Sequence, residues 1–413
     1  MFRSTFLKIA VLLPIFLVLS TVFLINHGWL SASPTHLVLM SQVQPNPSSS
    51  LTHVPMRHLL NGKAASLGWI VGSDCQRGMQ AYLQTADTNP DAALVGTGWV
   101  NPTDGTLIRG QSNSCVPGSL SMDNVVQLVH SKGGMAYLTI TMDTEDPGAW
   151  TARQEAEYID KATTTPSYID TIVHEVMRAH YDGVIMDLEE ADSSYSSIQQ
   201  LFATYNQHVW AALQPLHKLY GIALIHKVSD RDDFYKLNGF QDWRLLEHTA
   251  DFLVIMAVDQ SYFLPGPAVS TEWLKQMVAY AMQTMPDMLP NIIWELPLYG
   301  DTWHWDNGKW YFDHIVSYQD AQALIAQLTP DQIHASSSDL QSIYTPHVVY
   351  TDTDGVKRTL WYLTPQGLYN IIVALQQILQ QEPQFAGAHL QVAFWWRTTL
   401  EPYDFWHLLN SLY

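Results

Sequence analysis

Charged residues are scarce in this chain of 413 residues, and positively charged ones are the scarcest. Lys and Arg number 20 against 39 Asp and Glu, which gives a formal net charge of −19. The four types make up 14 % of the chain, against roughly 25 % in an average soluble domain. A surface so poor in Lys and Arg repels phosphate, which excludes nucleic acid as a partner. The apolar share of 47 % can build a sizeable core, which excludes intrinsic disorder.

Signatures of metals and cofactors are also missing. The only two cysteines are Cys75 and Cys115, and Cys and His do not cluster at metal-ligand spacing, so we expect no metal. A nucleotide or flavin signature is absent, so we expect no cofactor. In an oxidising compartment Cys75 and Cys115 can form a disulfide that closes a loop of about 40 residues. Two unpaired buried thiols are the alternative.

Aromatic residues, by contrast, are abundant at 12 % of the chain. Most aromatic side chains of any protein belong to its core, but rings also stack on the apolar faces of sugars. Sparse charge and many rings together favour an uncharged, polyhydroxylated ligand.

The N-terminus carries a local targeting signal. Arg3 and Lys8 precede an apolar run, Ile9–Ile25, which is just long enough to span a bilayer. We expect residues 1–30 to be an uncleaved signal anchor or a signal peptide cleaved near Ser33, with a buried core helix as a third reading. The basic flank predicts that the rest of the chain is extracytoplasmic, either membrane-anchored or secreted. Residues 31–63 resemble a linker.

Short β-like runs alternate with helical patterns from Leu67 onward, which is typical of repeated βα units. The predicted strands are Leu67–Val71, Leu94–Trp99, Met135–Ile140, Gly183–Leu188, Ile222–Ile225, Phe252–Ala257, Ile292–Leu298 and Leu390–Trp395. Thr271 and Thr364 are the expected starts of two of the helices between them. Eight strands predict an α/β protein with a closed (β/α)8 TIM barrel over residues 64–413. A doubly wound open sheet is the alternative, but no Gly-rich loop follows the first strand.

The gap after the seventh strand is too long for a simple loop and helix. It contains two β-like runs, His347–Asp352 and Val356–Leu363, on either side of Asp354-Gly355, which is a hairpin signature. We therefore expect a small α+β insertion at approximately residues 301–362, where it would form one wall of a cleft at the carboxyl end of the barrel.

The segment from Tyr181 to Glu190 carries the strongest chemical signal. Side chains alternate along a strand, so Asp187 and Glu189 share one face with Ile185. Two neighbouring carboxylates raise each other's pKa, and burial adds to this, so that one can stay protonated as a general acid. Barrel active sites also lie at the carboxyl ends of strands. Two solvated carboxylates at a strand-to-helix turn are the alternative.

This segment resembles the fourth-strand signature of glycoside hydrolase family 18, D-G-x-D-x-D-x-E. Asp182, Gly183, Asp187 and Glu189 match it, and Ile185 stands where the family has its middle Asp. Three further segments resemble family motifs in the same order: Met256 to Asp259, Leu296 to Gly300, and the closing strand with Trp396. The likeness covers about residues 64–413 and favours the bacterial branch that includes spore-germination and cortex-associated enzymes.

The resemblance implies a substrate-assisted, retaining cleavage of β-1,4 bonds in an N-acetylglucosamine polymer, either chitin or peptidoglycan. Glu189 would protonate the leaving oxygen, and Asp187 would orient the acetamide group that attacks the anomeric carbon. Asp259 and Tyr299 would hold the sugar in the −1 subsite, above a floor formed by Trp396. We expect a monomeric hydrolase whose partners are the polysaccharide and, if the anchor is uncleaved, the membrane.

Two departures from the family pattern predict an atypical activity. Ile185 removes a carboxylate that would tune the pKa of Asp187, and Val258 removes a phenol that would donate a hydrogen bond to the acetamide. Loss of such a donor can lower the rate on the order of 10²-fold. Tyr262 is a candidate to replace it. A non-catalytic carbohydrate-binding relative and a structural protein of the envelope stay as alternative functions, and the first does not need Glu189.

Overall fold

The computed structural model describes residues 66–71, 75–86, 91–108, 122–142, 150–231, 239–336, 345–388 and 390–395. All of them belong to one of the two units into which the chain divides, Val54–Tyr413. The predicted signal segment, the linker, Cys115 and Trp396 lie outside the described residues, as does the side chain of Cys75. Among the helices that are described, none is long and apolar enough to cross a membrane.

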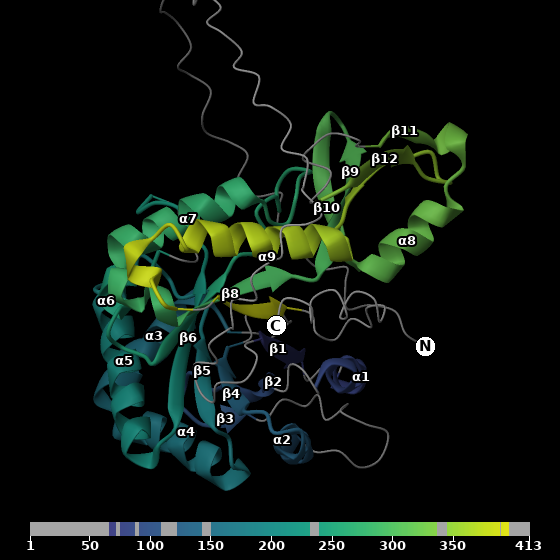
Figure 1. Ribbon diagram of the computed structural model, residues 1–413. Helices are drawn as coiled ribbons and strands as arrows, with labels where there is room; N and C mark the ends of the chain where they lie inside the picture. Colours follow the sequence, from purple (N-terminus) through teal and green to yellow (C-terminus); the bar gives the residue numbers. More distant parts are fainter. Residues whose placement is uncertain are drawn as a thin grey trace, which may run out of the picture. The chain divides into compact units, whose positions relative to one another are not determined.

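Eight parallel strands in the described part of the chain close into a barrel (Figure 1). They are β1 (Ser66–Val71), β2 (Asp91–Val100), β4 (Ala136–Thr141), β5 (Gly183–Asp187), β6 (Leu219–Ile225), β7 (Phe252–Met256), β8 (Ile292–Pro297) and β14 (Gln391–Trp395). The barrel closes where β1 pairs with both β2 and β14. A short strand, β3 (Leu107–Ile108), pairs antiparallel with the end of β2. All eight predicted strands and the (β/α)8 class are therefore confirmed, and the open sheet is excluded.

Helices connect the strands on the outside of the barrel (Figure 1). They are α1 (Cys75–Thr85), α2 (Met122–Ser131), α3 (Ala152–Thr164), α4 (Pro166–Ala179), α5 (Ile198–Leu213), α6 (Trp243–Leu246), α7 (Thr271–Thr284) and α9 (Pro365–Leu379). Thr364 caps α9 as predicted and accepts a hydrogen bond from the Gly367 backbone N–H at 2.9 Å. The expected cap of α7 was wrong by one residue, because Ser270 caps the helix and Thr271 is its first residue.

Two apolar layers follow from the alternation of side chains along the strands. The outward-facing residues pack against the helices, and the inward-facing residues fill the barrel. The inner layer includes Trp69, Ile185, Val254, Ile293 and Ala393. Since Ile185 and Ile293 point inward, the residues two positions further along β5 and β8, Asp187 and Glu295, point inward as well.

The insertion follows β8, as predicted. Its five strands are β9 (Tyr299–Asp306), β10 (Lys309–Ser317), β11 (Ile333–Ser336), β12 (His347–Thr351) and β13 (Lys357–Trp361). They form an antiparallel sheet in the order β10-β9-β13-β12-β11, which packs with α8 (Tyr318–Gln327) (Figure 1). The predicted hairpin is present as β12 and β13, with Gly355 at φ +78° in its turn. Because β9 begins two residues after β8 ends, the insertion starts at the carboxyl end of the barrel.

Candidate active site

Asp187 and Glu189 lie together at the carboxyl end of β5. Asp187 is the last residue of the strand and is 5 % exposed. Glu189 follows two residues later, just beyond the strand, and is partly exposed. A hydrogen bond joins the two side chains. The pair predicted from the sequence is therefore assembled, with Glu189 nearer to solvent than Asp187.

Burial and like charge keep protons on this pair. Burial raises the pKa of Glu189 well above its usual range, and the charge of Asp187 adds to the effect. Burial and then the charge of Glu295 raise the pKa of Asp187 to about 7, while the hydrogen bond with Glu189 opposes this increase. That bond favours the charged form of Asp187 and the neutral form of Glu189, so Glu189 is the donor. A protonated Glu189 at neutral pH meets the requirement for a general acid.

Asp259 and Tyr299 form a second pair at the same end of the barrel. Asp259 lies three residues after β7, and Tyr299 lies two residues after β8. The Tyr299 hydroxyl donates a 2.5 Å hydrogen bond to Asp259 Oδ1. Asp259 has a left-handed backbone with φ 62°, which is uncommon outside glycine and is typical of functional sites. The charge of Asp259 raises the pKa of Glu189, so the two predicted pairs lie close enough to interact.

Two predicted motif residues support the barrel from its opposite end. Asp182 precedes β5, and its Oδ2 accepts hydrogen bonds from the Ala136 backbone N–H and from His130 Nε2, each at 2.8 Å. A Cβ on Gly183 would lie 2.6 Å from the Leu219 carbonyl oxygen, so β5 and β6 need glycine here to pair. Asp182 and Gly183 are therefore structural, as their place at the start of the strand implies.

The atypical position 258 is filled by packing. Val258 is 8 % exposed and belongs to a small apolar cluster with Tyr299, which Met256 also contacts. The suggested substitute, Tyr262, stacks its ring on Phe312 of the insertion at 4.6 Å between centroids. Tyr262 thus joins the barrel to the insertion, and its backbone oxygen also accepts a hydrogen bond from Trp303 Nε1 at 3.2 Å.

Three buried acids near the site were not predicted. Glu295 on β8 and Asp301 on β9 are 1 % and 3 % exposed, and burial raises the pKa of each well above its usual range. Glu155 on α3 is fully buried, and its carboxyl accepts a hydrogen bond from the Glu190 backbone N–H at 3.2 Å. Because side chains alternate along a strand, the sequence places Glu295 at an inward position of β8, and this was the available signal for it.

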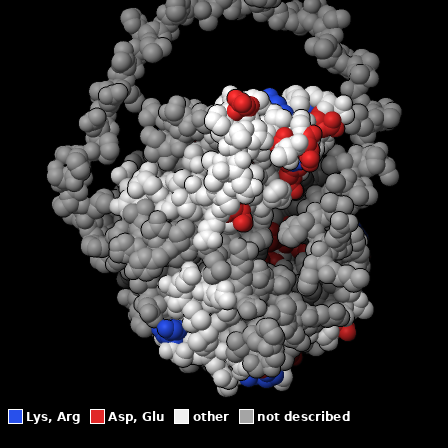
Figure 2. Space-filling model, turned by 90° about the vertical axis from the view of Figure 1, so that its right-hand side faces the viewer, with Lys and Arg blue, Asp and Glu red and all other residues white. Residues whose placement is uncertain are grey.

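Acidic side chains also gather on one face of the molecule. Figure 2 shows Asp and Glu side chains both on the upper part of one face and inside a hollow, while Lys and Arg lie near its edges.

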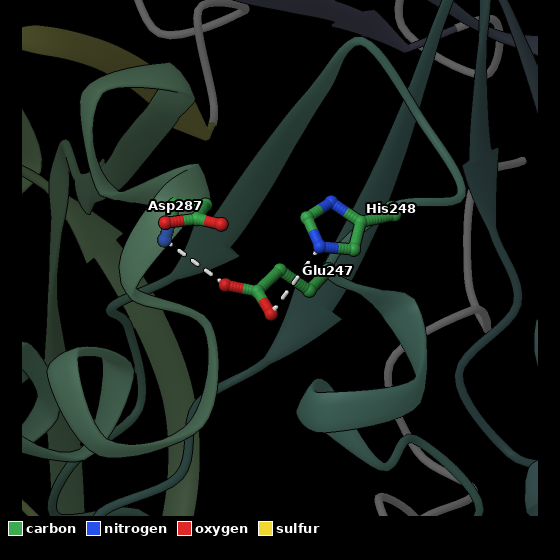
Figure 3. A group of neighbouring side chains, drawn as sticks. All are labelled: Glu247, His248 and Asp287. Carbon is green, nitrogen blue, oxygen red and sulfur yellow. Dashed lines mark hydrogen bonds and ion pairs between the residues drawn. The ribbon is translucent and has the colours of Figure 1, made fainter.

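One group in the described residues has the composition of a metal site, but it lies elsewhere. Glu247, His248 and Asp287 bring one ligand atom each within 4.8 Å of one another (Figure 3). They precede β7 and β8, at the amino end of the strands and opposite the candidate site. Glu247 already accepts a 2.9 Å hydrogen bond from the Asp287 backbone N–H, at the start of the turn of 3₁₀ helix that leads into β8. This contact accounts for the cluster as a helix cap.

Comparison with known proteins shows the fold. A scan against protein-family models and a search of curated proteins found no match. Among solved structures, the chain shares its fold with chitinases and spore cortex-lytic enzymes. The chitinase of Chromobacterium violaceum matches with a TM-score of 0.66 and 18 % identity, over 84 % of this chain and 98 % of that one. The spore cortex-lytic enzyme SleL of Bacillus cereus matches with a TM-score of 0.67 and 18 % identity, over 85 % of this chain and 75 % of that one. The group IV chitinase of Ostrinia furnacalis, solved with allosamidin, matches with a TM-score of 0.60 and 11 % identity, over 85 % and 98 % of the two chains.

Proposed function

We propose that this protein is a glycoside hydrolase of family 18 type that cleaves β-1,4 bonds in an N-acetylglucosamine polymer, chitin or peptidoglycan. The observation that carries the proposal is the Asp187–Glu189 pair: a buried carboxylate hydrogen-bonded to a partly exposed, protonated glutamate at the carboxyl end of β5. The shared fold with chitinases and cortex-lytic enzymes supports the same conclusion.

The roles follow from the geometry. Glu189 gives its proton to the glycosidic oxygen as the bond to the leaving sugar breaks. The acetamide oxygen of the substrate attacks the anomeric carbon, and anionic Asp187 stabilises the positive charge of the oxazolinium intermediate. Asp259 and Tyr299 bind the same sugar through their paired oxygens. Water then opens the intermediate and returns a proton to Glu189, so that the protein needs no cofactor.

The substitution Glu189→Gln tests this proposal. Glutamine keeps the size and the hydrogen bond to Asp187 but cannot protonate the leaving oxygen, so we expect turnover to fall by about 10²–10⁴-fold with little change in binding. The measurement is the release of reducing ends from chitin oligomers and from purified glycan strands of peptidoglycan. If the wild-type protein binds oligosaccharides but cleaves neither polymer, the chain is instead a carbohydrate-binding relative.

We also propose that the chain acts outside the cytoplasm, as a monomer anchored by residues 9–25 or released after their cleavage. The basic flank of Arg3 and Lys8 and the apolar run support export. Fractionation of cells that produce the full chain distinguishes the forms: an anchored protein sediments with membranes, and a cleaved one enters the medium with a shortened N-terminus. Recovery of the intact chain from the cytosol would contradict export.

A further inference from the structure

Gln241 is a fully buried glutamine that joins the carboxyl ends of β5 and β6, although it belongs to neither strand. Its side-chain Oε1 accepts a 2.8 Å hydrogen bond from the Ile225 backbone N–H, at the end of β6. Its Nε2 donates a 3.1 Å hydrogen bond to the backbone oxygen of Leu188, which is the residue between Asp187 and Glu189. One side-chain amide therefore connects the segment of the two candidate acids to the neighbouring strand.

This amide takes the place of a backbone hydrogen bond of the barrel sheet. Where β5 and β6 begin to pair, the Leu219 backbone N–H donates to the Asp182 oxygen at 3.1 Å, and in a parallel pair this pattern repeats every second residue. The register of the two strands carries the pattern on to the Ile225 N–H and the Leu188 oxygen. Gln241 stands between these two groups and bonds to both. The strands thus move apart at this point without leaving either backbone group unpaired.

The contacts of Gln241 form one half of a clamp around Glu189. The Glu190 backbone N–H, on the other side of Glu189, donates to the buried carboxyl group of Glu155 at 3.2 Å. Gln241 is held in its turn, because the buried Lys227 Nζ donates a 2.7 Å hydrogen bond to its backbone oxygen. The residues directly before and after Glu189 are each bonded to a buried side chain, while Glu189 itself is partly exposed.

We propose that Gln241 is a positioning residue for Glu189: its amide, inserted between β5 and β6, fixes the Leu188 carbonyl group and so sets where the acid stands at the rim of the barrel. This inference rests on the proposed function, because the work of Glu189 is to protonate the glycosidic oxygen. Only an amide offers the required donor and acceptor side by side without a charge. A reacting group displaced by about 1 Å can lose about 10²-fold in rate, so the clamp is worth more than its hydrogen bonds alone.

The substitution Gln241→Met tests the proposal on the polymer that the wild-type protein cleaves. Methionine keeps the length of the side chain but cannot bond to both the Leu188 oxygen and the Ile225 N–H. We expect kcat to fall about 10–100-fold. KM should change little, because Asp259 and Tyr299, which bind the sugar, follow β7 and β8 and do not depend on this contact.

Asn206→Leu is the matched control. Asn206 on α5 is also a fully buried amide, and it accepts a 2.6 Å hydrogen bond from the Tyr220 hydroxyl and donates one of 2.7 Å to the Phe202 backbone oxygen. Both partners lie away from the segment of Glu189, on α5 and near the start of β6. Both variants should lower the melting temperature, but only Gln241→Met should lower kcat. A wild-type kcat in Gln241→Met, or an equal loss in the two variants, would overturn the proposal.

Hydrogen exchange tests the same contacts without any turnover. The amides of Ile225 and Glu190 should exchange faster in Gln241→Met and keep their wild-type rates in Asn206→Leu, because only the first variant opens the clamp. Unchanged exchange of both amides in Gln241→Met would contradict the inference even if the protein proved to be a glycosidase. Faster exchange in a protein that cleaves neither polymer would contradict only the proposed function.

Discussion

The acids at the carboxyl end of the barrel differ in what they can do because their surroundings differ. Glu189 is partly exposed, so it can reach a substrate and still keep a proton at neutral pH. Asp187 is buried, and burial together with the charge of Glu295 raises its pKa to about 7. Burial and neighbouring charge can thus fit the same chemical group to two different roles, which in the proposed reaction are the acid and the electrostatic stabiliser.

These shifts predict the pH dependence of activity. Asp187 must be ionised, so kcat falls as the pH drops below about 7, where it takes up a proton. Glu189 must be protonated, so activity persists through neutral pH and falls on the alkaline side, as the pH rises through its increased pKa. A profile of kcat against pH should therefore be bell-shaped with its acidic limb near neutrality. An optimum near pH 4, with activity lost by pH 7, would contradict this account.

The sequence predicted those residues of the site that belong to local motifs. Asp187, Glu189, Asp259 and Tyr299 all lie where strand alternation and barrel geometry place them. The effect of Glu295 on the pKa of Asp187 could not be predicted, because β8 follows β5 by more than a hundred residues and only the fold brings the two strands into one barrel. Asp301 was missed for the same reason, since its raised pKa depends on burial and on Asp259. Trp396 and the Cys75–Cys115 disulfide stay predictions, because Trp396, Cys115 and the side chain of Cys75 lie outside the described residues.

At the scale of elements, the loop after β5 depends on a helix that precedes the strand. Glu155, in the first turn of α3, accepts a hydrogen bond from the Glu190 backbone N–H and so holds the residue next to Glu189. Its carboxyl is fully buried, and this burial raises its pKa to about 8. A buried acid of this kind holds the loop after β5 in place and lowers stability when it ionises.

Replacing Glu155 with Gln should change how stability depends on pH. The folded state binds the proton of Glu155 more tightly than the unfolded state, where the pKa is 4.5. Its contribution to stability is therefore complete below pH 4.5 and is lost as the pH rises toward 8. The free energy of unfolding of the wild-type protein should decline across this range, with about 3–5 kcal/mol from Glu155 as an upper estimate. The Gln variant should lack that share of the decline. Parallel curves for the two proteins in urea titrations would refute this.

Helix ends and the hairpin of the insertion can be predicted from neighbouring residues, whereas pairing between distant strands cannot. The Thr364-Pro365 start was right because cap and proline act within one turn, whereas the start of α7 was placed one residue late because Ser270 and Thr271 are both good caps. The hairpin of β12 and β13 was predicted from Asp354-Gly355, but its pairing with β9 was not, because that contact joins distant parts of the insertion.

At the scale of the whole molecule, closure of the barrel explains how the acids of the candidate site come together. Closure between β1 and β14 brings the ends of β5, β7 and β8 to one rim, and the insertion begins at that rim with Tyr299. The low positive charge of the chain matches a neutral sugar polymer and not a phosphate polymer. The (β/α)8 class was predictable because eight periodic strands are a strong signal, but the fold alone does not define the reaction.

The configuration of the newly formed product tests the central claim most directly. Substrate assistance involves two displacements at the anomeric carbon, so the first product released from a β-1,4-linked N-acetylglucosamine oligomer keeps the β configuration. Proton NMR of the reaction mixture within the first minutes, before the anomers equilibrate, measures this. We predict the β-anomer from the wild-type protein and, because its turnover is about 10²–10⁴-fold lower, no detectable product from Glu189→Gln in the same minutes. The α-anomer as the first product, or equal cleavage of an oligomer without acetyl groups, would contradict the account.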